Sequence, residues 1–148
     1  MDHRALGRSG VDVSRIILGC GNFGGIGSSP AFFGAGETEA EAHELLDAAW
    51  EAGITTYDTA DAYGGGRSET YLGNWLRSQG PEVRDRIVLT TKTFNPMTAG
   101  ADSGLAPARV RRQLATSLER LGVDAVDLYL PHAMDDATAV ASSIAWGR

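Results

Sequence analysis

Short apolar segments typical of buried strands alternate with amphipathic helical segments along most of this chain. The segments expected to be strands are residues 15–20, 54–59, 87–92 and 126–130. Their starts lie roughly 32 to 40 residues apart, which is enough for a strand, a helix and the loops between them. Strands separated by helices pair in parallel through right-handed crossovers, so this alternation predicts an α/β fold with a parallel sheet.

Amphipathic patterns and end signals predict a helix after each of the first three strands. Thr38 and Glu41 form a capping box at the start of the first helix, and Gly53 is expected to end it. Ser68 is expected to cap the second helix, and Pro107 suits the first turn of the third. The residues expected to face the core are Ala42, Leu45, Leu46 and Ala49 in the first helix, Tyr71, Leu72, Trp75 and Leu76 in the second, and Val110, Leu114, Leu118 and Leu121 in the third.

This order of elements predicts the fold class: α/β, of the (β/α)₈ TIM-barrel type. Eight such units would make a barrel of about 290 residues, and the 148 residues here carry an N-terminal hairpin over residues 4–13 and the first four βα units. Residues 1–148 are expected to form a single domain, the N-terminal half of a barrel. Residues 133–148 are expected to be a weakly structured tail, in which Asp135 or Asp136 could cap a short helix carrying Val140 and Ile144.

Charge and composition exclude several classes of partner. The formal net charge is −6, so neither nucleic acid nor an anionic membrane surface is expected to bind. No window approaches the ~20 apolar residues of a membrane span, and the polar residues 1–4 lack the apolar core of a signal peptide. The single cysteine, Cys20, excludes an internal disulfide framework and is typical of a reducing compartment. A cytoplasmic location is therefore expected.

Ionisable side chains stand at the ends of three of the expected strands. Asp58 ends the second strand, Lys92 the third and His132 the fourth, while Tyr63 follows Asp58 by five residues. Reactive groups collect at the carboxyl ends of parallel strands, so these four are candidate catalytic residues. Lys92 is the only lysine among thirteen basic residues. A lysine in a chain that otherwise uses arginine indicates a need for an ammonium group at that position.

Each of the four residues alone has an ordinary structural explanation, but together they predict a general-acid site. A phenol has a pKa near 10 and is a poor acid at neutral pH, and an ammonium beside Tyr63 would lower that pKa. A carboxylate would keep the ammonium charged and placed, and a neutral imidazole could donate a hydrogen bond to a carbonyl. No amino acid donates hydride, so reduction at this site would need a cofactor. No metal ion is expected there.

Two glycine-rich regions lie on the same expected edge of the sheet. The cluster Gly64-Gly65-Gly66 fits neither a P-loop nor a dinucleotide fingerprint, and it is interpreted as a turn that frees the backbone of Tyr63. The loop over residues 21–36 carries Phe23, Phe32 and Phe33, and a second loop covers residues 94–106. These phenylalanines could form the rim of an apolar pocket or simply anchor the loop, and both readings stay open.

Several segments together resemble the aldo-keto reductase family, in particular its bacterial members. The specific one is Asp-Thr-Ala-Asp-Ala-Tyr-Gly over residues 58–64, followed by Ser68-Glu69 and Leu72-Gly73. Thr91-Lys92, the segment Asp-Leu-Tyr-Leu-Pro-His over residues 127–132 and the opening Leu-Gly-Arg-Ser-Gly over residues 6–10 are similar to further landmarks of the family. The resemblance covers nearly all of residues 4–132.

The resemblance implies a catalytic tetrad and a reaction. Tyr63 would donate the proton, Lys92 would lower its pKa, Asp58 would pair with Lys92, and His132 would orient the carbonyl. The implied reaction is the reversible reduction of aldehydes or ketones to alcohols, with NADPH as the cofactor and a small-molecule carbonyl compound as the substrate.

The resemblance also indicates where the nicotinamide would lie. Gly21, Asn22 and Phe23 would lie near it, and Asp58 would also contact the nicotinamide ribose. The family holds most of NADPH, including the adenosine 2′-phosphate, with loops that follow the later strands of its barrel, beyond the four units expected here.

Alternatives of other classes stay open. The first and fourth strands would be free edges of a half-barrel, so the chain could be a fragment or could pair with a second copy. A truncated, catalytically incomplete half-barrel would then act as an assembly or interaction module and self-associate through its edges. An isomerase or lyase that uses Lys92 to form a Schiff base is a weaker alternative, because Asp58 and Tyr63 at this spacing favour redox chemistry.

Overall fold

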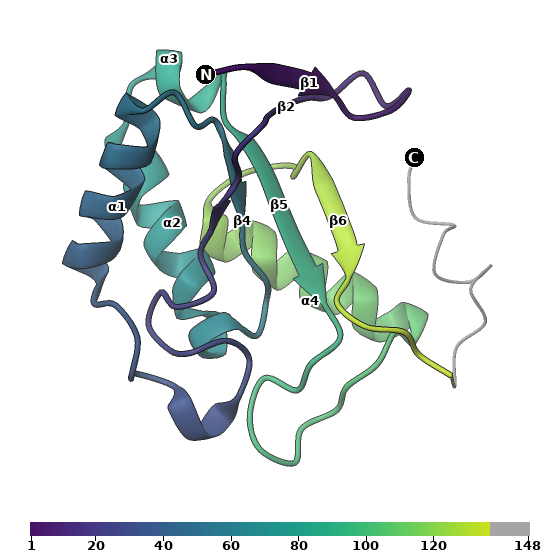
Figure 1. Cartoon of the computed structure of the whole chain (residues 1–148). Coiled ribbons are helices and arrows are strands. Elements are labelled where there is room, and N and C mark those ends of the chain that lie inside the picture. Colours follow the sequence, from purple (N-terminus) through teal and green to yellow (C-terminus); the bar gives the residue numbers. More distant parts are fainter. Residues whose placement is uncertain (137–148) are drawn as a thin grey trace.

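A computed structural model describes residues 1–136, which contain an antiparallel hairpin and a four-stranded parallel sheet (Figure 1). Strands β1 (His3–Ala5) and β2 (Asp12–Ser14) form the hairpin. The sheet has the order β3-β4-β5-β6, with β3 over Leu18–Gly19, β4 over Thr56–Asp58, β5 over Val88–Thr93 and β6 over Leu128–Pro131. The chain therefore has the partial (β/α) barrel architecture that the sequence predicts. The short helix expected to carry Val140 and Ile144 lies outside the described residues.

Helices connect successive strands of the sheet, and in Figure 1 they lie behind the sheet and to its left. Their bounds are Glu39–Glu51 for α1, Arg67–Ser78 for α2, Pro81–Arg84 for α3 and Pro107–Leu121 for α4, with short 3₁₀ turns η1 at Pro30–Phe32 and η2 at Tyr63–Gly66. The predicted capping box of α1 is confirmed, because the Glu41 amide donates to Thr38 Oγ1 and the Glu41 carboxylate accepts from the Thr38 amide. Pro107 begins α4 and Gly122 ends it in the left-handed conformation, as expected.

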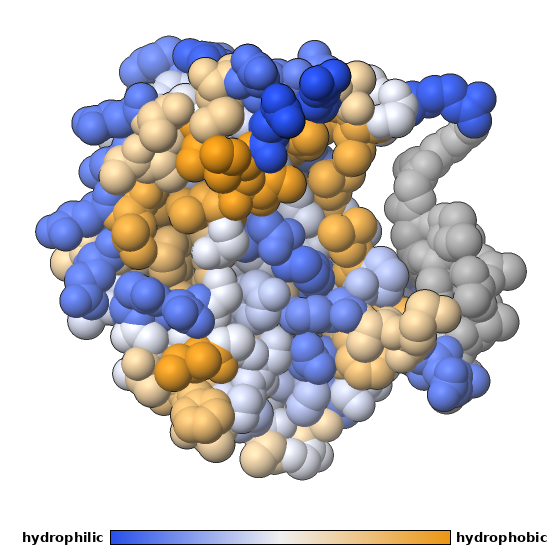
Figure 2. Space-filling view, in the orientation of Figure 1, coloured by the Kyte–Doolittle hydropathy of each residue, from blue (hydrophilic) through white to orange (hydrophobic). Residues whose placement is uncertain are grey.

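The parallel register aligns the carboxyl ends of the strands along one edge of the sheet. Gly19 lies opposite Asp58, Asp58 opposite Thr90, and Lys92 opposite Leu130. The face of the sheet turned away from the helices is mainly hydrophobic near the hairpin and more polar toward the carboxyl ends (Figure 2). The candidate residues therefore gather at the polar end of this face.

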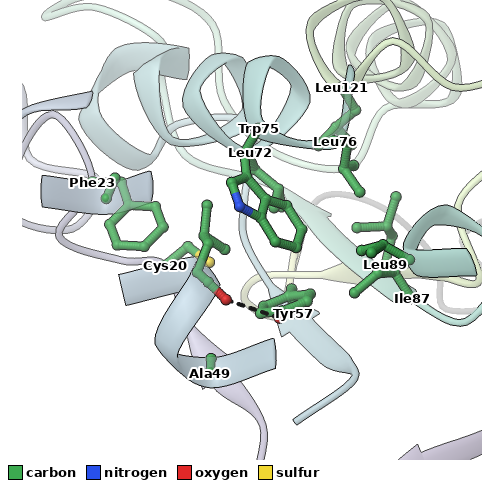
Figure 3. Close-up of a cluster of buried hydrophobic side chains, with 13 residues drawn as sticks. Cys20, Phe23, Ala49, Tyr57, Leu72, Trp75, Leu76, Ile87, Leu89 and Leu121 are labelled. Carbon is green, nitrogen blue, oxygen red and sulfur yellow. Dashed lines mark hydrogen bonds between the residues drawn. The ribbon is translucent and has the colours of Figure 1, made fainter. Parts of the chain in front are cut away.

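An apolar core fills the space between β4, α1 and α2 (Figure 3). The rings of Tyr57 and Trp75 meet edge to face, with centroids 5.6 Å apart, and Tyr57 donates a hydrogen bond to the Leu46 carbonyl. Leu46, Leu72 and Cys20 are fully buried around them. Burial raises the pKa of the Cys20 thiol far above its ordinary value, so this cysteine is a packing residue.

The first expected strand is shorter and more exposed than predicted. Only Leu18–Gly19 pair with β4, and the side chains of Ile16 and Ile17 are 56% and 49% exposed. The reason is that the preceding residues bond elsewhere: the Arg15 amide donates to the Asp2 carbonyl of the hairpin, and Ser14 Oγ donates to the Ile16 carbonyl. The prediction of a strand buried on both faces over residues 15–20 is therefore wrong: the strand begins only at Leu18, and Cys20 is the one residue of this segment that is buried.

Two predictions about the helices are also wrong. Ser68 does not cap α2, whose N-cap is Gly66; instead Ser68 Oγ lies inside the protein and donates to the Cys20 carbonyl at 2.8 Å. Leu45 of α1 is 44% exposed and lies outside the core. Both residues matched local patterns, but the angle at which each helix meets the sheet determines which side chains become buried.

The buried face of α4 is mixed rather than a continuous apolar stripe: Val110 and Leu121 are buried as expected, but polar residues are buried beside them. Leu114 and Leu118 are only half-buried, whereas Arg109 and Gln113 are 3% and 8% exposed. These two belong to a buried polar layer between α4, α2 and β5, whose members are Asp61, Glu69, Thr91, Thr93, Arg109 and Gln113. Burying polar groups is tolerated only where they are hydrogen-bonded, and each of these residues has at least one such bond within the layer.

Candidate active site

An ion pair between Asp58 and Lys92 joins the ends of two neighbouring strands. Asp58 is the last residue of β4, and Lys92 lies near the end of β5. Lys92 Nζ lies 2.5 Å from Asp58 Oδ2 and also donates to the Thr59 carbonyl at 2.9 Å. The side chain of Lys92 is 14% exposed, so its ammonium is held in one place by two acceptors beside a partly open face.

Tyr63 lies against this ammonium at the start of the turn η2. Lys92 Nζ is 5.0 Å from the centroid of the Tyr63 ring, within the range of a cation–π contact. The turn is formed by Gly64, Gly65 and Gly66, all of which have positive φ. At Gly64 a Cβ atom would also lie 2.6 Å from the Phe23 carbonyl oxygen, so a larger residue would displace the turn. The glycine cluster is therefore the tight turn that the sequence predicts.

His132 follows β6, and its ring packs against the Tyr63 ring. The two rings meet edge to face, with centroids 5.3 Å apart and planes at 86°. The His132 backbone amide donates to the Thr93 carbonyl, and ring atom Nδ1 lies 3.3 Å from Nδ2 of Asn95. Burial lowers the pKa of the His132 imidazole below 6.5; the Lys92 charge lowers it further, and the Asp58 charge opposes these effects. This direction favours the neutral form of the imidazole at pH 7.

The structure brings all four predicted catalytic residues together. The four residues come from β4, β5, the turn after β4 and the loop after β6. In the sequence, the first of them, Asp58, and the last, His132, are 74 positions apart. Such a cluster can transfer a proton from the phenol to an oxygen atom of a bound molecule. The ammonium, held by the carboxylate, can stabilise the phenolate that remains, and a neutral imidazole can donate a hydrogen bond to the same oxygen.

A cavity of about 360 Å³ opens beside this cluster. Its lining includes Gly21, Asn22, Phe23, Asp58 and Tyr63, so the residues expected to contact a nicotinamide share one cavity with the expected proton donor. Phe23 is 2% exposed and also belongs to the apolar core, so it anchors the loop as well as lining the cavity.

The other two loop phenylalanines differ from Phe23. Phe32 is 51% exposed, whereas Phe33 is half-buried. A Cβ atom added at Gly65 would come within 2.9 Å of the Phe33 ring, so that ring lies against the glycine turn. Phe33 therefore supports the turn that carries Tyr63, whereas Phe32 is exposed and is not among the residues that line the cavity.

Sequence reasoning did not identify Asn95 and Arg109, which lie next to the cluster. Asn95 faces His132, and Arg109 donates to the Asn95 carbonyl at 2.7 Å. One signal was present for Arg109: it occupies the first turn of α4, where a positive charge opposes the helix dipole. A basic residue in that position indicates a partner outside the helix.

Neither a metal centre nor a membrane span is found in the part of the chain that the structure describes. Within residues 1–136, no three His, Cys, Asp or Glu side chains are grouped so that they could hold a metal ion. Over the same residues, no helix combines the length and the apolar character needed to cross a membrane.

Comparisons with known proteins agree with this geometry. The family model described as "Aldo/keto reductase family" matches residues 15–145. The chain is 35% identical over 147 residues to the uncharacterized oxidoreductase YrpG of Bacillus subtilis, a match that covers 93% of this chain and 42% of that protein. It is 40% identical over 129 residues to the aldo-keto reductase str7 of Strobilurus tenacellus, covering 86% of this chain and 36% of that one.

Solved structures show the same likeness in three dimensions. The holo form of aldo-keto reductase AKR11C1 from Bacillus halodurans superposes with a TM-score of 0.78 at 29% identity, and the match covers 97% of this chain and 44% of that one. The chain thus spans less than half the length of the relatives that it matches. The family model, the sequence identity and the superposition together show that the chain belongs to the aldo/keto reductase family of oxidoreductases.

Proposed function

We propose that this chain carries the proton-donor site of an NADPH-dependent reductase that converts aldehydes or ketones to alcohols. The observation that carries the proposal is the placement of Lys92 Nζ, which bonds Asp58 on one side and lies over the Tyr63 ring on the other. Aldo-keto reductases act on small carbonyl compounds with NAD(P)H. The arrangement described here has the groups that such a reaction needs to protonate the carbonyl oxygen of the substrate.

Tyr63 is the proton donor in this proposal. Its hydroxyl gives a proton to the carbonyl oxygen, and the charge left on the phenolate is stabilised by the Lys92 ammonium. Asp58 and the Thr59 carbonyl hold that ammonium in position at 2.5 and 2.9 Å. The ion pair therefore positions the positive charge before the proton moves, which limits the reorganisation needed during the reaction.

His132 orients the substrate in this proposal. Its imidazole is neutral at pH 7 because burial and the Lys92 charge lower its pKa. A neutral ring has one N–H, and this group can donate a hydrogen bond to the carbonyl oxygen while Tyr63 approaches the same atom. The edge-to-face contact between the two rings keeps both groups at one side of the substrate.

The cavity fits the nicotinamide end of the proposed cofactor. When bound, NADPH supplies the hydride that the side chains lack. Gly21, Asn22, Phe23 and Asp58 line a space of about 360 Å³, which suits a nicotinamide and its ribose rather than a whole dinucleotide. Gly21 borders this space directly beside the proton donor, since a Cβ atom there would be in ordinary contact with the Tyr63 ring, at 3.8 Å.

Two other functions have less support. A Schiff base needs an uncharged amine with a free lone pair, but Lys92 Nζ donates to both Asp58 and Thr59, which is the arrangement of an ammonium. An interaction module would act through β3 and β6, the two edges of the four-stranded sheet. Self-association through these edges stays a prediction.

The test of this proposal replaces Lys92, which is the only lysine in the sequence. We expect Lys92→Met to abolish measurable NADPH oxidation with a panel of aromatic and aliphatic aldehydes, because the variant lacks the charge that stabilises the phenolate. Lys92→Arg should not restore activity, since a planar guanidinium does not fit a site built around a compact ammonium. Arg86→Met removes a charge that lies over Trp50 and serves as the control. Wild-type rates in Lys92→Met, or no oxidation by the wild type with any carbonyl, would contradict the proposal.

A further inference from the structure

Arg109 is a buried arginine whose hydrogen bonds organise the loop between β5 and α4. Its side chain is 3% exposed. The guanidinium donates to Thr93 Oγ1 at 2.8 Å and to the carbonyl oxygens of Asn95, Gly104 and Asp102 at 2.7, 3.1 and 3.3 Å. One side chain thus ties both ends of the loop over residues 94–106 to the end of β5.

Asn95, which this loop presents, faces the imidazole of His132. Nδ2 of Asn95 lies 3.3 Å from Nδ1 of His132. An amide nitrogen can only donate a hydrogen bond, so Nδ1 must accept. A neutral imidazole carries one proton, and if Nδ1 accepts, that proton is on Nε2.

We propose that Asn95 is a positioning residue that holds His132 in the Nε2–H tautomer, and that Arg109 holds Asn95 in place for this task. The meaning of the tautomer for catalysis rests on the proposed reductase function, in which Nε2–H is the group that donates to the carbonyl oxygen. The tautomer itself depends only on the contacts described here.

A second link between the loop and the histidine segment supports this role. Asp135, three residues beyond His132, accepts a hydrogen bond from the Leu105 amide at 2.6 Å. The loop is therefore attached to the segment after β6 at Asn95 and at Leu105. A displacement of the loop would move the partner of His132 and the backbone that follows it together.

The geometry also explains why an arginine is needed in an unfavourable place. Arg109 lies in the first turn of α4, where the helix dipole disfavours a positive charge. A guanidinium has five N–H donors in a planar fork, so it can reach one hydroxyl and three carbonyl oxygens at once. A lysine has a single donor atom and cannot span these acceptors.

The first experiment measures the tautomer of His132 by nitrogen NMR of the ring in the purified protein. The chain has three histidines, so loss of one set of signals in His132→Gln identifies its resonances. We expect neutral His132 to be Nε2–H in the wild type. Asn95→Asp keeps the shape of the side chain but replaces the donor with an acceptor, and it should reverse the tautomer to Nδ1–H. Asn95→Leu should give a mixture, with the ratio shifted about tenfold from the wild type. An Nδ1–H wild type, or an unchanged tautomer in Asn95→Asp, would overturn the proposal.

The second experiment separates positioning by Arg109 from a merely structural role. Arg109→Lys should move the His132 ring signals toward those of Asn95→Leu. Arg112→Lys is the matched control, because Arg112 lies on the same helix, is exposed and pairs with the Asp102 side chain of the same loop. Its His132 signals should not move. If Arg109→Lys and Arg109→Gln lower only the unfolding temperature and leave His132 unchanged, Arg109 does not position Asn95.

Activity measurements then distinguish this inference from the proposed function. If the wild type reduces aldehydes, Asn95→Asp should lower kcat about 10-fold, the order of one hydrogen bond, with little change in NADPH binding. If the tautomer reverses as expected but no carbonyl compound is reduced, the reductase function is wrong and the positioning role of Asn95 stands. If reduction occurs and the tautomer does not respond to Asn95, the reverse holds.

Discussion

The apolar core around Tyr57 and Trp75 and the polar layer around Arg109 are both buried, yet different kinds of contact hold them together. Side chains of the core fill space between α1, α2 and β4, and their contacts have little directional requirement (Figure 3). Side chains of the polar layer each need a partner at a defined distance and angle. Asp61 Oδ2, for example, accepts from Thr93 at 2.6 Å and from Gln113 at 3.1 Å.

The position of the polar layer explains why it is polar. Thr91 and Thr93 flank Lys92 on β5, and Asp61 lies two residues before Tyr63. The side chains of these neighbours point into the layer, where Glu69 accepts from Thr91 and Asp61 accepts from Thr93. The candidate site is therefore supported by directional bonds rather than by loose packing. We infer that the core mainly stabilises the fold, whereas the layer also maintains the geometry of the site.

The largest effect is expected for Tyr63→Phe, which changes neither region. It removes the hydroxyl that donates the proton, so kcat should fall about 10²–10⁴-fold. Tyr63 is half-buried and its hydroxyl is not among the bonds of the polar layer, so the unfolding temperature should stay close to that of the wild type. NADPH oxidation and thermal unfolding, measured on the same sample, test both expectations. Near-normal turnover in this variant would exclude Tyr63 as the proton donor.

The next effects contrast one residue from each region. Leu72→Ala leaves a cavity in the core and should lower the free energy of unfolding by about 2–5 kcal/mol, without changing turnover per folded molecule. Glu69→Gln should cost about 1–3 kcal/mol, because Glu69 accepts from Thr91 at 2.7 Å and from Arg120 at 3.0 Å. It should also lower turnover, since Thr91 precedes Lys92. Denaturant unfolding and steady-state kinetics separate the two outcomes.

A pH series adds a check on the same pair of variants. Burial raises the pKa of the Glu69 carboxyl above 4.5. The folded wild type therefore binds a proton there before the unfolded chain does, and gains stability from this group as pH falls toward 4.5. The Leu72→Ala variant retains this gain and Glu69→Gln lacks it. Equal pH dependence in both variants would mean that the pKa of Glu69 is not raised in the folded protein.

The smallest effect concerns His132. Its pKa is lowered below the unfolded value of 6.5 by burial and by the Lys92 charge. Well above pH 6.5 both states carry the neutral ring, and the group no longer contributes to the pH dependence of stability. As pH falls through 6.5 the unfolded chain takes up a proton before the folded one does, so this group progressively destabilises the folded state. The slope of unfolding free energy between pH 7 and 5 should be smaller in His132→Asn than in the wild type.

Local signals in the sequence were sufficient for most of the architecture. The alternation of apolar strands and helices predicted a parallel sheet, and the capping box at Thr38 and the helix ends at Pro107 and Gly122 were also correct. These features depend on short-range chemistry, such as a side chain bonding an amide three residues away. The failures at Ile16, Leu45 and Ser68 share one cause: burial depends on how an element packs, which a local pattern does not specify.

The sequence by itself determined which residues stand at the carboxyl ends of the strands, because the end of each short apolar segment can be located from local patterns. Asp58, Tyr63, Lys92 and His132 were found in this way, and parallel pairing was enough to bring them together. Only the tertiary structure decided what lies behind them. Arg109 bonds backbone carbonyl oxygens, a group that every residue offers, and the side-chain amide of Asn95 faces the ring of His132, which is far away in the sequence. Such contacts leave no trace in residue type or spacing, since they depend on where the folded backbone places the two partners.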